Sequence, residues 1–548
     1  MTSIGERLVQ ELADRGVEVV FGIPGVHTVE LYRGLAASPI RHVTARHEQG
    51  AGFMADGYAR ATGLGKVRLG VAFVITGPGL TNVLTAMAQA RADSSSMLVI
   101  SSVNPRASLG RGLGHLHELP AQQAMMATVA LSSHQINGSD DLVPVLNAAF
   151  DSFANERGGP VHIELPMDVI ALPYVPKAVA VGAAVRRADA KDIDIQAIVT
   201  RFQAAKTPVI LAGGGAKFCD LDLVALAEKL DAPVVMTINA RGLMHGHPLG
   251  VPASPTLGAT RDLIGAADLV LALGTELGPT DYDHYGDNAA LPLAEMIRID
   301  ICPNQLARHQ TAGAICGPLE RVLPKLLGAL NDSIVEAKSG GAARAARARA
   351  AAWAEIGPAM QRQTALLEVL RRLCPRAIFV GDSTQPVYAG NLYYDHDRPG
   401  GWFNAASGFG ALGFGIPAAI GVALAQPDTR VICITGDGGA QFTLPELMVA
   451  VDEKLPVVFL IWNNGGYGEI DSSMQAAGVT VVGCDPTPPV FGAIAKACGM
   501  PFARCVMTPE AVTAAVRNVL DHSGPVMIEI DMLAACDSGQ TKQVGCNA

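Results

Sequence analysis

The sequence lacks several features that would assign it to large classes of proteins. No uninterrupted apolar run reaches the roughly 20 residues of a membrane-spanning helix, so we expect no membrane partner. The ten cysteines are scattered with no Cys-x-x-Cys pair, which favours reduced thiols over zinc ligands or a disulfide framework. With a net charge of −10 and no concentrated basic patch, nucleic acid is not an expected partner. The first residues show no secretory pattern of basic and then apolar residues, so we expect a cytoplasmic location.

What the sequence does contain is a large apolar fraction. Hydrophobic residues make up 49% of the 548 positions and charged residues 17%, which is typical of a chain with extensive buried cores. A chain of this length should hold several domains, because single cores stop growing well before this size. Short apolar runs bounded by turn residues predict the buried strands of α/β units. Such runs lie at 160–166, 208–212, 269–273, 297–300 and 377–380.

Two polar residues with glycine neighbours follow two further apolar runs. Asp437, within Gly-Asp-Gly, comes after the run 431–434, and Asn464, within Asn-Asn-Gly-Gly, comes after the run 457–461. Continuous apolar runs of this length predict parallel strands buried on both faces, and one crossover helix over 444–453 would complete a βαβ unit. The two side chains should therefore emerge side by side at the carboxyl edge of a sheet, where open α/β folds bind ligands.

The side chains at this edge indicate a metal site. Asp-Gly and Asn-Gly are ordinary turn formers, so an isolated Gly-Asp-Gly is more often only a turn. A carboxylate and an amide oxygen nevertheless suit a hard cation such as Mg²⁺, which favours oxygen ligands and usually keeps substrate phosphates in its shell. The arrangement of Asp437 and Asn464 therefore predicts a diphosphate held through a metal ion.

Further motifs near the N-terminus extend this pattern. They lie at 21–27, 46–52, 55–60 and 76–82. Together with Gly-Asp-Gly and Asn-Asn, they resemble, in order and over nearly the whole chain, the acetolactate synthase and 2-oxo acid decarboxylase family of thiamine-diphosphate enzymes. The resemblance implies an α/β fold of three doubly wound parallel-sheet domains. It places the pyrimidine-binding domain at 1–180, a central domain at 190–330 and the diphosphate-binding domain at 350–548.

The resemblance also implies a cofactor and the residues that bind it. Thiamine diphosphate would be held through Mg²⁺, with Asp437, Asn464 and the carbonyl group of Gly466 as metal ligands. Leu412 would wedge between the two rings of the cofactor and keep it bent, while the carbonyl group of Gly410 would accept its amino group. The cofactor-binding positions implied by the resemblance are Glu48, Gly79, Asn82, Ser383, Thr384, Gln385, Gly410, Leu412, Asp437, Gly438, Gly439, Asn464 and Tyr467.

The sequence allows two interpretations of Glu48. By itself it would be a solvated acid in the first turn of a helix, where the helix dipole favours negative charge. Within Arg-His-Glu-Gln-Gly it resembles the family's cofactor-activating glutamate. A carboxyl group hydrogen-bonded to the aminopyrimidine ring favours the imino tautomer, whose nitrogen can take the thiazolium C2 proton, so the cofactor acts as its own base.

Four further polar residues are candidate catalytic groups. His27, His115, His117 and Glu118 lie where relatives place active-site polar groups, and one of them could supply the proton that releases an aldehyde. Each histidine is as readily structural, because histidine is a common polar core residue. Val26 stands where decarboxylases of the pyruvate type carry an acid, and a histidine at position 27 resembles benzaldehyde lyase.

The overall pattern most resembles the 2-ketoarginine (5-guanidino-2-oxopentanoate) decarboxylases, on the stretches 22–28, 116–120, 381–386 and 467–470. We therefore expect a non-oxidative 2-oxo acid decarboxylase that gives an aldehyde and CO₂. A guanidinium substrate would need a carboxylate, and Glu118, Glu469 or Asp471 could supply it, although the latter two are as readily solvent-facing. Two alternatives stay open: a carboligase or lyase that makes or cleaves 2-hydroxy ketones, and a catalytically silent scaffold with the same fold.

Three expectations concern the rest of the chain. The triple glycine 213–215 follows a strand and could cradle a phosphate, as in relatives that bind FAD, but we expect only a tight turn without flavin. The Gly-, Ala- and Arg-rich stretch 339–352 is expected to be a connector that leads into a helix. The resemblance also implies a homodimer or homotetramer in which two subunits share each active site.

Overall fold

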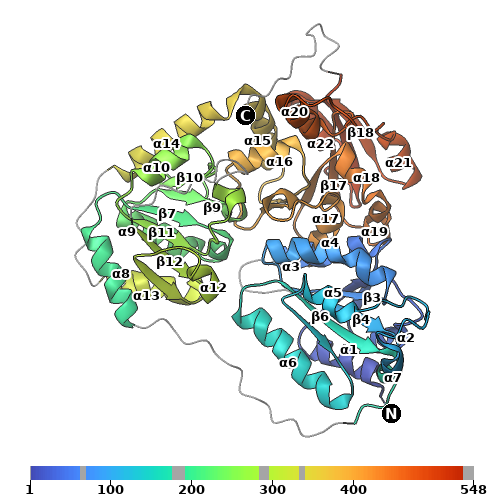
Figure 1. Ribbon diagram of the computed structural model, residues 1–548. Coiled ribbons are helices and arrows are strands. Elements are labelled where there is room, and N and C mark those ends of the chain that lie inside the picture. The colour runs from blue at the N-terminus through green and yellow to red at the C-terminus, as the bar shows by residue number, and fades with distance from the viewer. Residues whose placement is uncertain (1, 62–68, 176–191, 283–294, 332–339, 535–548) are drawn as a thin grey trace.

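The computed structural model describes residues 2–61, 69–175, 192–282, 295–331 and 340–534. Each of its three units is a six-stranded parallel sheet with helices between the strands, and the prediction of three parallel α/β units is confirmed. In Figure 1 the first unit lies at the lower right, the second at the left and the third at the upper right. None of the helices in these ranges is long and apolar enough to cross a membrane.

The first unit is built on a sheet whose strands run parallel throughout. Its strands, in spatial order, are β2 (Arg41–Thr44), β1 (Val19–Gly22), β3 (Gly70–Val74), β4 (Met97–Val103), β6 (Pro160–Pro166) and β5 (Ser132–Gln135). Its helices are α1 (Ile4–Asp14), α2 (Val29–Ala36), α3 (Glu48–Arg60), α4 (Pro78–Ala92), α5 (Gln122–Ala127), α6 (Ser139–Asn155) and α7 (Met167–Ile170). The central strands β3, β4 and β6 are fully buried, as their continuous apolar sequences predict.

The second unit repeats this architecture with shorter strands. Its sheet has the order β10 (Gly250–Val251), β8 (Val234–Met236), β7 (Val209–Ala212), β11 (Val270–Leu273), β12 (Met296–Asp300) and β13 (Gly313–Cys316). Its helices are α8 (Asp192–Ala204), α9 (Asp220–Leu230), α10 (Gly258–Gly265), α11 (Pro279–Tyr282), α12 (Pro303–Leu306) and α13 (Leu319–Asn331), and a short strand β9 (Arg241–Met244) precedes β10. Two helices, α14 (Gly341–Glu355) and α15 (Gly357–Leu373), lead to the third unit. The expected connector is therefore helical from Gly341 onward.

The third unit carries the Gly-Asp-Gly and Asn-Asn motifs. Its sheet has the order β15 (Trp402–Asn404), β14 (Ile378–Gly381), β16 (Val431–Gly436), β17 (Val457–Asn463), β19 (Val526–Asp531) and β18 (Phe502–Val506). Its helices are α16 (Gln385–Leu392), α17 (Gly415–Ala425), α18 (Asp437–Gln441), α19 (Leu447–Asp452), α20 (Gly468–Ala476), α21 (Phe491–Ala497) and α22 (Pro509–Arg517).

The connection between β16 and β17 differs from the prediction. The predicted helix over 444–453 is present as a 3₁₀ turn over Leu444–Glu446 followed by α19, but an additional helix, α18, begins at Asp437 itself. The chain breaks between α18 and the 3₁₀ turn, where Thr443 leaves the helical conformation and its hydroxyl group donates to the carbonyl group of Gly413 at 2.8 Å. This tertiary hydrogen bond favours the break, and the local sequence gives no sign of it.

The first and third units share one hydrophobic core. Helix α3 packs against α17, and the two lie side by side in Figure 1. The rings of Phe53 and Phe414 meet edge to face with centroids 5.4 Å apart. Glycine is required at position 57, because a Cβ there would lie 2.7 Å from the carbonyl carbon of Ala418. The close approach of α3 to α17 therefore fixes the first unit against the unit that carries the metal motif.

Candidate active site

Asp437 and Asn464 lie together at the carboxyl edge of the third sheet. Strands β16 and β17 pair in parallel with Gly436 opposite Trp462, and each polar residue directly follows its strand. Oδ1 of Asp437 accepts a hydrogen bond from the backbone N–H of Asn464 at 3.3 Å, whereas Oδ2 is buried with no partner in the described part of the chain. Burial raises the pKa of the Asp437 carboxyl group, against the effect of neighbouring backbone N–H groups. A buried carboxylate oxygen of this kind is costly unless it binds a cation.

The amide group of Asn464 provides a second test for a cation. One amide terminus lies 2.7 Å from the carbonyl oxygen of Gly466 and 3.0 Å from Oδ1 of Asp437. With nitrogen at this terminus, both contacts are hydrogen bonds. With oxygen there, three oxygens converge on one point, which requires a positive ion between them. These three groups are the metal ligands that the sequence predicts, and a single carboxylate with two neutral oxygens suits Mg²⁺ that is also bound by a phosphate.

Two glycines let neighbouring side chains pack closely at this edge. A Cβ at Gly438 would lie 2.6 Å from Cε1 of Tyr467, and a Cβ at Gly439 would lie 3.2 Å from Cγ of Asp382. Both residues are buried, so a side chain at either position would displace its neighbour. The structure therefore brings Gly438 and Tyr467, two of the predicted positions, into contact, and places Gly439 beside Asp382.

The residues after β14 lie at the same edge. Ser383, Thr384 and Gln385 are half-buried, and Gln385 begins helix α16. Asp382, which the sequence analysis did not single out, is fully buried and accepts hydrogen bonds from the backbone N–H groups of Ser383, Gly413 and Gly415 at 2.8, 3.3 and 3.0 Å. Desolvation raises the pKa of Asp382 to about 6, although these N–H groups lower it. This carboxyl group therefore fixes both the start of the Ser383–Gln385 segment and the chain that follows Gly410 and Leu412.

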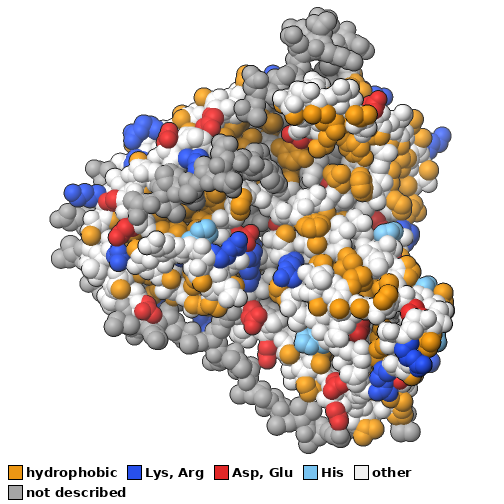
Figure 2. All heavy atoms as spheres, viewed as in Figure 1, with side chains coloured by type: hydrophobic (Ala, Val, Ile, Leu, Met, Phe, Trp, Pro, Cys, Tyr) orange, Lys and Arg blue, Asp and Glu red, His pale blue; other side chains and the backbone are white. Residues whose placement is uncertain are grey.

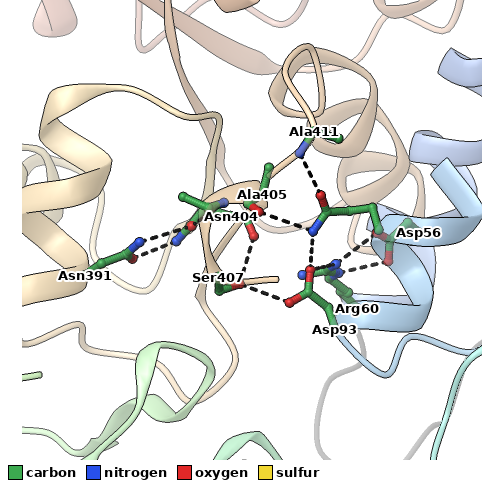
Figure 3. A network of polar contacts seen from close by, with 10 residues as sticks. Asp56, Arg60, Asp93, Asn391, Asn404, Ala405, Ser407 and Ala411 are labelled. Carbon is green, nitrogen blue, oxygen red and sulfur yellow. Dashed lines mark hydrogen bonds and ion pairs between the residues drawn. The ribbon is translucent and has the colours of Figure 1, made fainter. Parts of the chain in front are cut away.

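The segment from Ala405 to Leu412 is held by the first unit. The backbone N–H of Ala411 donates to Oε1 of the buried Gln89 at 3.1 Å, and Nε2 of Gln89 donates to the carbonyl group of Ala405 at 3.3 Å. The hydroxyl group of Ser407 donates to Asp93 at 3.0 Å, as Figure 3 shows. Gly410 is exposed with φ of +77°, a conformation that favours glycine, and Leu412 is half-buried. Both residues are thus presented at the surface of a firmly held loop.

A buried ion-pair network in the first unit contacts this loop through Asp93. Arg60 forms two hydrogen bonds to Asp56, at 2.8 and 2.9 Å, and one to Asp93 at 2.6 Å. The guanidinium group also lies over the rings of Phe403 and Phe414, with distances of 5.4 and 5.2 Å to the centroids. Figure 3 shows Asp56, Arg60 and Asp93 approaching the Ala405–Ser407 turn from the neighbouring unit. A charge network of this kind is identified only from long-range contacts, so the sequence did not reveal it.

Glu48 begins helix α3 at the edge of the first sheet. Its Oε2 accepts a hydrogen bond from Nδ2 of Asn82 in the first turns of α4, at 2.9 Å. A Cβ at Gly79 would lie 3.3 Å from Oε1 of Glu48, so glycine keeps the space beside this oxygen open. The structure therefore brings Glu48, Gly79 and Asn82 together, with one carboxylate oxygen bound and the other beside open space.

His27 and His117, both in the first unit, form a pair of neighbouring rings. Their ring centroids lie 5.1 Å apart, and Nδ1 of each ring is buried without a partner in the described residues. Burial and the neighbouring His117 lower the pKa of His27. His117 has φ of +62°, and its backbone packs on Gly77, where a Cβ would lie 2.7 Å from the Cβ of His117. An unusual backbone conformation at a half-buried ring such as that of His117 is typical of a functional position.

His115 and Glu118 are placed differently from the histidine pair. His115 is exposed, and the carboxylate of Glu118 accepts backbone N–H groups from Leu113, Gly114 and His115 at 3.2, 2.7 and 3.0 Å. Slight desolvation raises the pKa of Glu118, but these N–H groups outweigh it and the pKa is lowered. The loop backbone therefore already occupies the oxygens of Glu118, which leaves this carboxylate poorly suited to protonate or bind a substrate.

The triple glycine forms a 3₁₀ turn over Gly214–Ala216 directly after β7. The same turn lines a cavity of about 340 Å³ between all three units. Polar groups from each unit face it, among them Arg60, Lys217 and Ser407. The residues predicted to bind the thiamine cofactor lie outside its lining, so the cavity is distinct from the edges described above. That the triple glycine forms a turn without bound flavin stays a prediction, and a flavin band in the absorption spectrum of the purified protein would contradict it.

Comparison with known proteins agrees with this geometry. Residues 2–125, 195–326 and 382–530 match models described as the N-terminal TPP binding domain, the central domain and the C-terminal TPP binding domain of thiamine pyrophosphate enzymes. A Pseudomonas aeruginosa protein named probable 2-ketoarginine decarboxylase is 40% identical over 96% of this chain and 93% of its own. The acetolactate synthase isozyme 3 large subunit of Escherichia coli is 32% identical over 86% and 83% of the two chains. An acetolactate synthase of Mycobacterium bovis is 32% identical over 85% and 76%.

Proposed function

We propose, from the premise that the chain belongs to the thiamine pyrophosphate enzyme family, that it is a thiamine-diphosphate- and Mg²⁺-dependent decarboxylase of a 2-oxo acid. The products are CO₂ and an aldehyde one carbon shorter than the substrate. One observation carries this proposal: a single chain presents the Glu48 carboxylate bound to Asn82, and an amide terminus of Asn464 within 3.0 Å of both Oδ1 of Asp437 and the carbonyl oxygen of Gly466.

The residues of the third unit hold the cofactor by its diphosphate. Asp437, Asn464 and the carbonyl group of Gly466 would hold Mg²⁺, which would supply positive charge for the diphosphate of the cofactor. Gly438 and Gly439, in the short helix that begins at Asp437, would lie beside that diphosphate. Ser383, Thr384 and Gln385 add polar contacts from the neighbouring strand end. The unpartnered Oδ2 of Asp437 supports this assignment, because a cation would satisfy it.

The residues of the first unit act on the ring system. Thiamine diphosphate, when bound, supplies a nucleophilic carbon and an electron sink that permits CO₂ loss from a 2-oxo acid. Glu48 would exchange a proton with the aminopyrimidine ring, and Asn82 keeps its carboxylate oriented for that exchange. The carbonyl group of Gly410 would accept a hydrogen bond from the amino group of the ring, and Leu412 would pack against the cofactor.

Protonation before aldehyde release is assigned to the His27 and His117 pair. Within the described part of the chain, each ring has a buried nitrogen without a partner, and a bound ligand could satisfy it. His115 is exposed and Glu118 is bound to its own loop, so neither competes well for this role.

The substrate is proposed to carry a guanidinium group, as in 2-ketoarginine, since the protein that is 40% identical bears that name. Such a group needs a carboxylate that is free to form a bidentate contact. Glu469 on α20 is exposed and follows the metal motif directly, whereas the Glu118 oxygens are occupied. Asp471 is half-buried and bound to Gln475. Glu469 is therefore the side chain that best meets the requirement.

Carboligation is the second candidate function. It uses the same cofactor and metal, and relatives that are 32% identical are named acetolactate synthases. In that case a second carbonyl compound would take the place of the proton, and the product would be a 2-hydroxy ketone. A catalytically silent scaffold is the third candidate, and intact Glu48, Asp437 and Asn464 argue against it because a scaffold needs no proton-transfer carboxyl group.

One experiment separates these candidates. The purified protein is incubated with thiamine diphosphate, Mg²⁺ and a panel of 2-oxo acids that includes 5-guanidino-2-oxopentanoate, with and without an acceptor aldehyde. CO₂ with a free aldehyde supports decarboxylation, and a 2-hydroxy ketone supports ligation. No turnover despite calorimetric binding of the cofactor would leave the scaffold, and no binding at all would contradict the whole proposal.

We further propose that two subunits share each active site in a homodimer or homotetramer. Exposed apolar side chains lie next to both halves of the site: Val26, Leu116, Phe409 and Phe442. Figure 2 shows hydrophobic patches over the first and third units on the right of the view. An exposed apolar surface of this kind is typical of a protein interface.

A further inference from the structure

Glu446 lies in the third unit, but its carboxylate is bound by the backbone that precedes Glu48. The backbone N–H of His47 donates to Oε1 of Glu446 at 2.9 Å, and that of Arg46 is shared between Oε1 and Oε2 at 3.2 and 3.1 Å. The residue is 1% exposed, so the contact is fully enclosed. A carboxylate 400 positions away in the sequence therefore binds the residues that enter helix α3.

The fit between Glu446 and this helix is close. Gly50, in the first turn of α3, is required there because a Cβ would lie 2.9 Å from Cγ of Glu446 and closer still to its carboxylate. The first turn of a helix has unpaired N–H groups and a partial positive charge, which a nearby carboxylate stabilises. Burial raises the pKa of Glu446 to about 7, against the effect of the Arg46 and His47 N–H groups. Glu446 therefore binds the start of α3 through buried hydrogen bonds to the backbone N–H groups of Arg46 and His47.

The segment that carries Glu446 also contacts the third-unit half of the site. The backbone N–H of Glu446 donates to the carbonyl group of Thr443 at 3.0 Å, and the Thr443 hydroxyl group donates to the carbonyl group of Gly413 at 2.8 Å. Gly413 is the residue after Leu412, and α18 with Asp437 ends two residues before Thr443. One short segment is therefore joined both to the loop that carries Leu412 and to the start of the helix that carries Glu48.

We propose that Glu446 is a positioning residue for Glu48: it fixes the residues that enter α3, and thereby the orientation in which Glu48 meets the cofactor ring. The inference rests on the proposed function, since Glu48 needs an exact orientation only if it exchanges a proton. Asn82 holds the Glu48 side chain, and Glu446 holds the backbone from which that side chain starts. Removal of Glu446 leaves the metal ligands in place but frees the start of α3.

The test compares four variants of the full-length protein. Glu446→Ala removes both backbone contacts, Glu446→Gln keeps an acceptor for His47, and Gly50→Ala displaces the Glu446 carboxylate without altering it. Asp452→Asn is the matched control: Asp452 binds the Arg46 side chain between the same two units, but it is 54% exposed and accepts nothing from the Arg46 backbone. Each variant is measured for Mg²⁺-dependent cofactor binding by calorimetry, for kcat and KM, and for deuterium exchange at C2 of the bound cofactor.

We expect Glu446→Ala and Gly50→Ala to bind thiamine diphosphate within about 3-fold of wild type, and to lose about 100-fold in kcat and in C2 exchange with little change in KM, because a displacement of about 1 Å costs this much. Glu446→Gln should recover part of the loss, and Asp452→Asn should match the wild type. Wild-type exchange and kcat in Glu446→Ala would overturn the inference. If that variant does not fold, wild-type exchange in folded Gly50→Ala overturns it equally. Failure of the wild-type protein to bind the cofactor would instead contradict the proposed function.

Discussion

Nδ2 of Asn82 donates a hydrogen bond to Oε2 of Glu48 at 2.9 Å, and this contact joins the first turns of α4 and α3. The two helices follow different strands of the first sheet, so the geometry of the carboxylate is set by the sheet and not by a flexible loop. Oε1 is left beside the space that Gly79 keeps open. One oxygen is held and the other is available, which is the arrangement that a proton-exchanging carboxyl group needs.

Glu48→Gln should keep cofactor affinity and lose at least about 100-fold in kcat, because an amide can accept a hydrogen bond but cannot exchange the proton. Calorimetry with Mg²⁺ and steady-state decarboxylation measure the two effects separately. Asn82→Ala is the companion variant, and it should lower kcat less, since the carboxyl group remains but loses its orientation. A Glu48→Gln protein with near wild-type kcat would remove Glu48 from its role.

Asp437→Ala should weaken Mg²⁺-dependent cofactor binding by more than about 100-fold, because even residues that only support a metal ligand contribute about 10- to 100-fold. The pKa of Asp437 is raised in the metal-free protein, and Mg²⁺ binds the deprotonated carboxylate. Affinity should therefore fall as the pH is lowered, beginning at a higher pH than for an ordinary aspartate. Calorimetric titrations over a pH series measure this, and pH-independent affinity from neutral to acid conditions would contradict the assignment.

The His27 and His117 pair predicts a pH profile. A histidine that donates a proton must be protonated, so kcat should fall as the pH rises through the pKa of His27. The pKa of His27 is lowered by burial and by His117. His117→Asn keeps a residue type that tolerates positive φ and removes the neighbouring ring, so the alkaline fall in kcat should move to higher pH. An unmoved profile would show that His27 does not supply the proton.

Residues encoded within one short motif could be predicted from the sequence, and residues defined by contacts between distant segments could not. Asp437, Asn464 and Gly466 follow two strands whose apolar runs and glycine-rich ends are visible locally. Gln89 and Glu446 have no such local pattern: Gln89 binds a loop 322 positions away, and Glu446 binds backbone 400 positions away. The hydrogen bonds between the Glu118 carboxylate and its own loop could not be predicted either. They depend on the positive φ angles of the glycines at 112 and 114, which bring loop N–H groups onto this carboxylate. The additional helix α18, which ends before a tertiary contact of Thr443, was missed for the same reason.

Gly57→Ala should destabilise the fold by about 1–3 kcal/mol, because the added methyl group would overlap the backbone of Ala418 where α3 packs on α17. Gly328→Ala, in helix α13, is the matched control: no atom lies within 4 Å of the new Cβ. That change should leave stability unchanged or raise it by up to about 1 kcal/mol, since alanine is the better helix former. Thermal unfolding midpoints measured at one scan rate compare the three proteins, and equal midpoints for Gly57→Ala and wild type would contradict the packing described for α3.

Shared active sites predict complementation between two inactive chains. Glu48→Gln lacks the proton-exchanging group and Asp437→Ala lacks the metal ligand, so each homo-oligomer should be inactive. If one site takes Glu48 from one subunit and Asp437 from its partner, a mixed dimer contains one site with both residues intact and one with both changed. After subunits are allowed to exchange, activity should rise toward about a quarter of wild type, because half of randomly mixed dimers are heterodimers and each has one of two sites intact. Sites formed within one chain would give no recovery, since every site would then lack one of the two groups. Exchange itself is followed with differently tagged chains, so that absence of activity in proven heterodimers contradicts the shared site.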